Sequence, residues 1–281
     1  MSTAEQKILV TGASRGIGSA IALELAAAGF EVVAGVRDDE GAEAVRTAAA
    51  ARGVAVRTTA LDVTDEAVCR GVVDAERPWG LVNNAGYAQS GAVTEVADDD
   101  ARAQLETLVL APVRLARLAA PHMREAGGGR IVNISSITAE IPSPLLGWYQ
   151  AAKMAMEGVS DAMRLELRAD GIDVVLVQPG AVQTDIWADT RDRLPASTRF
   201  GPTASRWSTF TRRLEPYMTS PEAIARAVRG AMTTERPRDR YPVGVDAQVL
   251  TRVARFVPVP VTDAATRTLL NLWSRSTPDA A

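Results

Sequence analysis

KILVTGASRGIG, residues 7–18, is the stretch that decides the fold. Its first five residues form the short apolar run typical of a buried parallel strand, and the helical sequence AIALELAAAG follows at 20–29. Between them Gly12 permits a tight turn, Gly16 lets the backbone approach a pyrophosphate, and Gly18 allows the helix to pack closely on the strand. The start of the helix offers N–H groups and a positive dipole to phosphate. Because strand, loop and helix come in this order, the stretch predicts a dinucleotide site rather than an ordinary turn.

Beyond this stretch, short β-branched runs alternate with longer Ala-rich amphipathic segments, a pattern typical of βαβ units around a parallel sheet. The sequence therefore predicts an α/β fold with a single doubly wound Rossmann-type domain, in which helices flank a seven-stranded parallel sheet. The strands are expected at residues 7–11, 31–36, 54–61, 80–84, 130–135, 173–178 and 240–245, and the helices at 17–28, 39–52, 64–76, 98–126, 147–170 and 220–232.

The domain organisation follows from the same pattern. We expect residues 1–246 to form a dinucleotide-binding catalytic domain. Residues 185–219 are rich in Arg, Trp, Thr and Pro without a steady period, which predicts a flexible insertion of loop and short helix acting as a substrate lid. Residues 247–281 are expected to be a C-terminal extension that packs on the domain or on a partner subunit.

Composition excludes several classes of function. Hydrophobic residues make up 47% of the 281 and charged residues 23%, so the chain has enough apolar sequence for a sizeable core. A net charge of −3 gives no attraction to nucleic acid or to an anionic membrane. With one cysteine, Cys69, and one histidine, His122, neither a disulfide nor a Cys/His metal cluster is expected. We find no signal peptide and no membrane span, and expect a cytoplasmic protein that binds no metal.

The end of the second strand indicates which cofactor is bound. An acidic residue there would bond the ribose 2′-hydroxyl of NAD, but the chain reads Gly35, Val36, Arg37. Arg37, together with Arg15 of the glycine loop, suits a 2′-phosphate, because the planar guanidinium matches phosphate oxygens. The neighbouring Asp38 is interpreted as a helix cap. The sequence therefore predicts NADP(H) in preference to NAD(H).

GWYQAAKMAMEG, residues 147–158, places Tyr149 and Lys153 one helical turn apart, on one helix face. A tyrosine with its ordinary pKa of about 10 is a poor base, but a nearby cation favours the phenolate. The pair therefore suits proton transfer. Taken alone, however, a tyrosine and a lysine at this spacing also occur by chance on ordinary surface helices.

These motifs do not stand alone. TGASRGIG is followed by LDV at 61–63, NNAG at 83–86, the spacing of Ser136, Tyr149 and Lys153, and PGAVQT at 179–184. From Lys7 to about Val245 the chain thus resembles the short-chain dehydrogenases/reductases, in their single-domain branch. The resemblance implies an oxidoreductase that transfers a hydride between NADP(H) and a carbonyl or secondary alcohol, and a homodimer or homotetramer. Ile186, Trp187, Phe200, Trp207 and Phe210 in the lid favour a hydrophobic small-molecule substrate.

The resemblance also assigns roles to residues. Ser136 would orient the substrate oxygen, Tyr149 would act as general acid or base, and Lys153 would lower the tyrosine pKa and bind the nicotinamide ribose. Asp62 and Val63 would bracket the adenine, Asn84 would face the adenosine ribose, and PGAVQT would wrap the nicotinamide. The predicted cofactor-binding set is Gly12, Ser14, Arg15, Gly16, Ile17, Gly18, Arg37, Asp62, Val63, Asn84, Gly86, Tyr149, Lys153, Pro179, Gly180, Val182 and Thr184.

One position departs from the family's pattern. Leu108 stands where the family usually carries an asparagine that serves a proton relay through a water. Because Pro112 has no N–H to bond the carbonyl of residue 108, we hypothesise that this carbonyl holds the relay water instead. Alternatively, Leu105, Leu108 and Leu115 are simply a packing stripe. A cofactor-binding sensor or scaffold with little turnover is therefore the alternative function.

Overall fold

The computed structural model describes residues 6–194, 199–253 and 256–270. Seven parallel strands form one sheet in the order β3-β2-β1-β4-β5-β6-β7, as predicted. Because the chain winds outward from β1 to one edge and then resumes at β4 on the other side, the strand order reverses between β1 and β4, where open α/β sheets bind ligands. The strands are β1 (Lys7–Thr11), β2 (Glu31–Val36), β3 (Arg57–Ala60), β4 (Gly80–Asn83), β5 (Gly129–Ile134), β6 (Ile172–Pro179) and β7 (Arg240–Val243).

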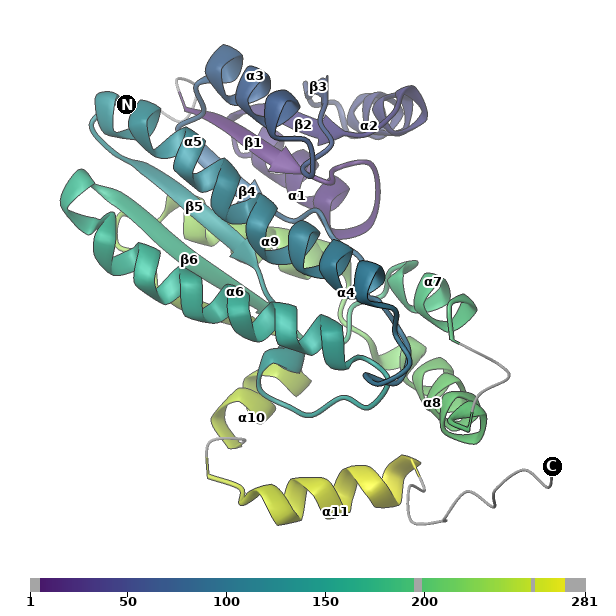
Figure 1. Ribbon diagram of the computed structural model, residues 1–281. Helices are drawn as coiled ribbons and strands as arrows, with labels where there is room; N and C mark the ends of the chain where they lie inside the picture. The colour runs from purple at the N-terminus through teal and green to yellow at the C-terminus, as the bar shows by residue number, and fades with distance from the viewer. Residues whose placement is uncertain (1–5, 195–198, 254–255, 271–281) are drawn as a thin grey trace.

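Helices cover both faces of the sheet (Figure 1). Successive strand residues point to opposite faces, so Ile8 and Val10 pack in the core under α1, α2 and α9, whereas Leu9 packs in the core under α3, α5 and α6. All three side chains are fully buried. The bounds are α1 (Gly16–Ala27), α2 (Asp39–Arg52), α9 (Pro221–Thr233), α3 (Glu66–Glu76), α5 (Ala111–Glu125) and α6 (Gly147–Glu166).

The single helix predicted over residues 98–126 is wrong. Instead α4 (Asp98–Leu105) leads into a π-helical segment, η2 (Glu106–Leu110), before α5 begins. The N–H of Ala111 donates to the carbonyl of Glu106, five residues back. Pro112 offers no N–H to the carbonyl of residue 108 and so disfavours regular α-helical bonding here. The wider turn splits the expected leucine stripe: Leu108 packs beside Ala152, while Leu115 joins the core under α3 and α5.

The lid region contains more helix than the sequence pattern suggested. α7 (Ile186–Asp192), α8 (Gly201–Leu214) and a 3-10 turn, η5 (Glu215–Tyr217), lie beyond the carboxyl ends of the strands (Figure 1). The rings of Trp187 and Trp207 pack with centroids 6.1 Å apart and join the two helices.

Two further helices follow β7. They are α10 (Val245–Val253) and α11 (Val259–Leu270), so the boundary predicted at residue 246 falls in the first turn of α10. Leu270 of α11 is buried in an apolar cluster with Ala204 and Trp207 of the lid. In the described part of the chain no helix is both long and apolar enough to cross a bilayer, and no group of three or more His, Cys, Asp or Glu side chains suits a metal ion.

Arg130 of β5 is a buried cation that holds the end of α9. Its Nη1 donates to the carbonyls of Ala231 and Thr234 at 2.6 and 2.7 Å, and its Nη2 lies 2.7 Å from Asp173 Oδ2. The guanidinium also lies over the ring of Trp79, 5.8 Å from its centroid. The last carbonyls of a helix have no partner within that helix, so Arg130 supplies one from the sheet.

We therefore predict that Arg130→Met lowers the free energy of unfolding by about 2–4 kcal/mol, because buried carbonyls and the Asp173 carboxylate lose their partner. Urea denaturation measures the change. Arg168→Met, at an exposed arginine, is the control and should change stability by less than about 0.5 kcal/mol. Equal effects of the two substitutions would contradict the role given to Arg130.

Candidate active site

The glycine loop after β1 is built by close backbone approach. Gly12 and Gly16 adopt φ of +62° and +58°, a region that favours glycine. A Cβ on Gly12 would lie 2.7 Å from the Cα of Ala85, and one on Gly18 would overlap the carbonyl oxygen of Gly12. Ile17 packs against the core beneath the loop. The turn and the close packing predicted for Gly12 and Gly18 are therefore present.

The start of α1 has the properties of a phosphate site. Asp38, Asp65 and Ser220 cap α2, α3 and α9 with side-chain hydrogen bonds, whereas α1 has no side-chain cap and no acidic residue in its first turn. The first N–H groups of a helix have no partner within that helix, and with the dipole they attract anions. This end of α1 fits the pyrophosphate of a dinucleotide.

Asn84 follows β4 and holds the glycine loop in place. Its Nδ2 donates to the carbonyls of Thr11 and Gly12, both at 3.0 Å, and the N–H groups of Asn84 and Ala85 donate to Thr11 Oγ1. Asn84 and Ala85 thus tie the end of β4 to the end of β1 and to the glycine loop. The Asn84 side chain, which we expected to face a ribose, is engaged with the loop itself.

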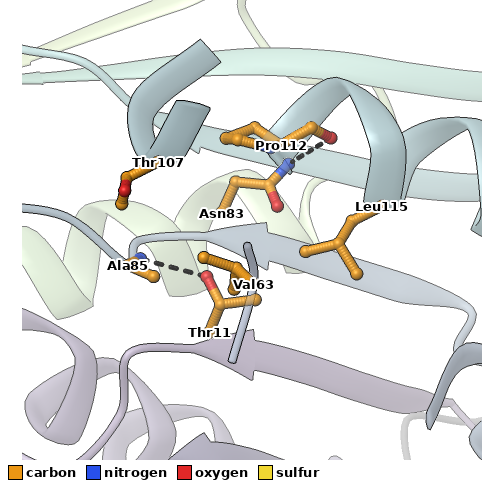
Figure 2. A pocket seen from close by; sticks show the side chains of 7 residues that line it. All are labelled: Thr11, Val63, Asn83, Ala85, Thr107, Pro112 and Leu115. Carbon is orange, nitrogen blue, oxygen red and sulfur yellow. Dashed lines mark hydrogen bonds between the residues drawn. The ribbon is translucent and has the colours of Figure 1, made fainter. Parts of the chain in front are cut away.

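A narrow crevice, too small to admit a water molecule, lies between the carboxyl ends of β1 and β4 and the start of α5. Figure 2 shows its lining, with Asn83 between the β4 strand and Pro112 of α5. Asn83 Nδ2 donates to Asn133 Oδ1 at 2.8 Å, while its own buried Oδ1 lacks a partner within the described ranges. The lining residues are Thr11, Val63, Asn83, Ala85, Thr107, Pro112 and Leu115. None of the expected catalytic residues is among them.

Asp62 and Arg37 lie near one another on the same side. The N–H and Oγ1 of Thr64 donate to Asp62 Oδ1 at 2.9 and 2.7 Å, and these bonds, aided by the charge of Arg37, lower the pKa of Asp62. Arg37 is exposed at the tip of β2. Ser14 lies against Gly41 at the start of α2, where a Cβ on Gly41 would come 2.9 Å from Ser14 Cβ. Asp38 accepts a hydrogen bond from Gly41 N, which confirms its interpretation as a cap.

Arg15 does not join Arg37. Its Nη2 lies 2.6 Å from Asp189 Oδ2 and its Nη1 lies 3.3 Å from Asp185 Oδ2, so it pairs with the lid at α7. The glycine loop and the lid are therefore linked by charge. The structure therefore does not bring Arg15 and Arg37 together as the pair of arginines that the sequence suggested for a 2′-phosphate.

Ser136, Tyr149 and Lys153 are brought together at the carboxyl end of β5. Ser136 caps the short 3-10 helix η3 (Ile137–Ala139) by accepting from Thr138 N at 3.2 Å, and its side chain lies close enough to the Tyr149 hydroxyl to favour the phenolate. Lys153 Nζ donates to the carbonyl of Ile134 at 2.7 Å and lies 5.6 Å from the centroid of the Tyr149 ring. The buried Ser135 Oγ finds no partner in the described part of the chain.

Burial dominates the electrostatics of this pair. It raises the pKa of Tyr149 to about 12, against the opposing effect of the nearby Ser136 side chain, and it lowers the pKa of Lys153 to about 8, against the negative charge of Glu157. Desolvation disfavours the charged form of each group. The expected lowering of the tyrosine pKa by Lys153 is absent, because the ammonium lies over the ring and bonds Ile134 rather than the phenol oxygen.

The loop after β6 lies opposite the glycine loop. Pro179 ends β6, Gly180 N donates to the carbonyl of Val243 at 2.9 Å, and the buried Val182 pairs with Thr219. Thr184 faces the glycine loop, 3.4 Å from where a Cβ on Gly16 would stand. Asp246, which no sequence motif singled out, accepts a hydrogen bond through its carboxylate from the N–H of Ala181 in this loop at 2.7 Å.

Apolar side chains surround Tyr149 on the lid side. Tyr149 packs on a cluster that includes Leu145, Leu146 and Trp207, with Ile186, Trp187 and Phe200 at its margin. Phe210, expected in the same lining, instead lines a separate pocket of about 270 Å³ between α8 and α11, with Arg206, Arg213 and Leu269.

Leu108 and Gly86 meet beside α6. A Cβ on Gly86 would overlap Leu108 Cδ2, and Leu108 is 2% exposed beside Ala152 of α6. Gly86 is thus placed against η2 rather than at an open surface. His122 pairs with Asp74 at 3.2 Å, and Cys69 Sγ donates to the carbonyl of Val63 at 3.4 Å. Both contacts are remote from Tyr149.

Comparison with known proteins agrees with this geometry. A model of the family described as short chain dehydrogenase matches residues 6–195. Retinol dehydrogenase 5 of Mus musculus is 31% identical over 283 residues, covering 92% of this chain and 86% of that protein. A solved short-chain dehydrogenase from Streptomyces avermitilis has a TM-score of 0.75 and 32% identity, with 97% of each chain covered. A metagenomic short-chain oxidoreductase in complex with NADP has a TM-score of 0.67 and 29% identity, covering 84% of this chain and 95% of that one.

The family match spans most of the length, and the two solved relatives share the fold of the chain. The chain therefore belongs to the short-chain dehydrogenases/reductases and is an NAD(P)-dependent oxidoreductase.

Proposed function

We propose that the protein transfers a hydride between NADP(H) and a carbonyl or secondary alcohol of a hydrophobic substrate, with Tyr149 as general acid or base. The observation that carries the proposal is the position of Tyr149. Its hydroxyl lies beside the Ser136 side chain, its ring lies beside Lys153, and it borders the apolar cluster of the lid. The proposed proton donor, Tyr149, therefore lies next to both the orienting hydroxyl of Ser136 and the apolar surface proposed to bind the substrate.

In this proposal the cofactor supplies the hydride, and the residues of the chain handle the proton. Ser136 Oγ orients the substrate oxygen beside the Tyr149 hydroxyl. During reduction Tyr149 donates its proton to that oxygen, for which a neutral phenol is the required form. The pKa of Tyr149, about 12, keeps the proton on the phenol near neutral pH. Lys153, with a pKa of about 8, exchanges protons near physiological pH and so suits a relay behind the tyrosine.

Two observations support NADP(H) as the cofactor, and two others support an apolar substrate. Arg37 stands exposed at the tip of β2, and the nearest following carboxylate, Asp38, caps α2. One solved relative carries NADP. For the substrate, the lid presents Trp187 and Trp207 toward the cluster at Tyr149, and a relative similar along most of this chain is a retinol dehydrogenase.

Assembly and location belong to the same proposal. Exposed apolar residues on the outer sides of η2 and α6, Leu110, Met154 and Leu165, are 54%, 54% and 67% exposed, which favours burial against a second subunit. We propose a homodimer or homotetramer in the cytoplasm. The sensor or scaffold without turnover remains the alternative, since Leu108 replaces a relay residue. The geometry of Ser136, Tyr149 and Lys153 favours turnover.

The acid–base role is tested by Tyr149→Phe. We expect turnover of any carbonyl substrate found in an NADPH oxidation screen to fall by at least about 10³-fold, within the range of general acid–base contributions, with NADPH affinity nearly unchanged. Tyr87→Phe, at a ring packed by Arg193 of the lid, is the matched control. A Tyr149→Phe variant that keeps its rate contradicts the mechanism, and tight NADPH binding with a silent screen favours the sensor.

Cofactor choice is tested by comparing dissociation constants. We expect NADPH to bind more tightly than NADH, and Arg37→Ala to weaken NADPH by about 10- to 100-fold, since a lost charge-assisted contact is worth about 1.5–3 kcal/mol. NADH should hardly be affected. Arg46→Ala, which removes an exposed arginine paired with Glu43 on α2, is the control. Tighter binding of NADH by the wild type would refute the preference.

The relay is tested by Leu108→Asn. If the backbone carbonyl of residue 108 already holds the relay water, the rate should change by less than about tenfold, although burying an amide costs about 1–3 kcal/mol of stability. Leu105→Asn, in the same cluster, controls for that loss, with the folded fraction followed by circular dichroism. A gain in rate of orders of magnitude in Leu108→Asn alone would mean that the native relay is broken.

A further inference from the structure

Asp246, in the first turn of α10, reaches back to the loop that follows β6. Its Oδ2 accepts a hydrogen bond from the N–H of Ala181 at 2.7 Å, and its Oδ1 accepts one from the N–H of Ala247 at 2.9 Å. One carboxylate therefore joins the start of a C-terminal helix to the PGAVQT loop. Hydrogen bonds to a charged acceptor are about twice as strong as neutral ones.

The surrounding backbone leaves room for this carboxylate. A Cβ on Gly180 would overlap both carboxylate oxygens of Asp246, and a Cβ on Gly244 would lie 2.5 Å from Oδ1. Gly244 also has a φ of +109°, which favours glycine. The Asp246 carboxylate thus occupies the space that side chains at Gly180 and Gly244 would otherwise fill.

The same loop is held from the other side by Thr219, at the end of the lid. Thr219 N donates to the carbonyl of Ala181 at 2.8 Å, and Gln183 N donates to the carbonyl of Thr219 at 2.9 Å. Both backbone groups of Ala181 are therefore bonded, the carbonyl by Thr219 and the N–H by Asp246. In addition, α10 contacts η3, the short helix that Ser136 caps.

We propose that Asp246 is a positioning residue, which fixes the backbone of residues 180–184 in the shape that holds the nicotinamide half of the cofactor. The inference rests on the proposed function, in which this loop wraps the nicotinamide. Without the carboxylate, the Ala181 N–H loses its partner and the loop is held by Thr219 alone. Asparagine is a poor substitute for Asp246. The N–H groups of Ala181 and Ala247 face the two carboxylate oxygens, and in asparagine one of these N–H groups would face the amide nitrogen instead of an oxygen.

The experiment compares two ligands by calorimetry. NADPH reaches both halves of the site, whereas adenosine 2′,5′-bisphosphate reaches only the adenosine half. We expect Asp246→Ala and Asp246→Asn to weaken NADPH at least about tenfold, or 1.4 kcal/mol, while the bisphosphate binds as it does to the wild type. With a substrate found in the screen, kcat falls as well. Glu235→Ala, at an exposed carboxylate after α9, removes the same charge and should leave both affinities unchanged.

A double-mutant cycle gives a second test that does not depend on one variant folding well. Gly180→Ala forces a methyl group into the Asp246 carboxylate, so it should weaken NADPH strongly in the wild type and much less in the Asp246→Ala background. Such non-additivity reports direct contact between two sites. Thermal unfolding of each variant shows which fraction is folded.

The outcomes separate the two proposals. Three results would each overturn the role of Asp246. They are a folded Asp246→Ala variant that binds NADPH as tightly as the wild type, equal weakening of the binding of both ligands, and additive effects in the double-mutant cycle. The proposed function itself fails if the wild type binds NADPH no more tightly than the bisphosphate and if no carbonyl compound in the screen causes NADPH oxidation. A positioning role for Asp246 toward the nicotinamide then fails as well.

Discussion

The hydrogen bond from Lys153 Nζ to the carbonyl of Ile134, 2.7 Å long, is the contact on which the site depends. It joins α6 to the carboxyl end of β5 in a place where the lysine is only 7% exposed. Ser136 follows Ile134 by two residues, and Tyr149 precedes Lys153 by one helical turn. Holding the lysine at that carbonyl therefore sets the tyrosine hydroxyl beside Ser136, and the geometry of three residues follows from one contact between helix and strand.

The cost of burying an ammonium at this position is partly offset by a negative charge further along α6. Glu157 lies one turn beyond Lys153, with Oε1 accepting from Gln178 Nε2 at 3.2 Å and Oε2 from Arg240 Nε at 3.0 Å. Strands β6 and β7 thus hold a carboxylate within reach of the lysine. This charge raises the pKa of Lys153, but desolvation outweighs it, and the net direction is downward. In the proposed reaction, the balance gives a neutral phenol to donate and an amine that titrates near neutral pH.

Local patterns allowed much of this site to be predicted. The strand–glycine–helix order of residues 7–18, the strand spacing and the shared helix face of Tyr149 and Lys153 follow from short-range rules, whereas Ser136 was assigned to the pair by the resemblance to the family. What escaped prediction depends on contacts between distant segments. Arg15 was assigned to a phosphate, yet it lies beside Asp185 and Asp189 of the lid. The π-helical turn before Pro112 keeps the same apolar residues but redistributes them between two cores. Asp246 had no recognisable motif, because its partner is the backbone N–H of Ala181, 65 residues away.

The central claim, that desolvation sets the protonation of Tyr149 and Lys153, can be measured directly. The sequence contains only two lysines, Lys7 and Lys153, so the ¹³Cε spectrum of lysine-labelled protein carries two signals, which Lys7→Arg assigns. We predict that the Lys153 signal of the cofactor-free protein titrates near pH 8, well below the ordinary value of 10.5. Titration at 10.5 or higher would show that the ammonium stays charged beside Tyr149, and would contradict the account.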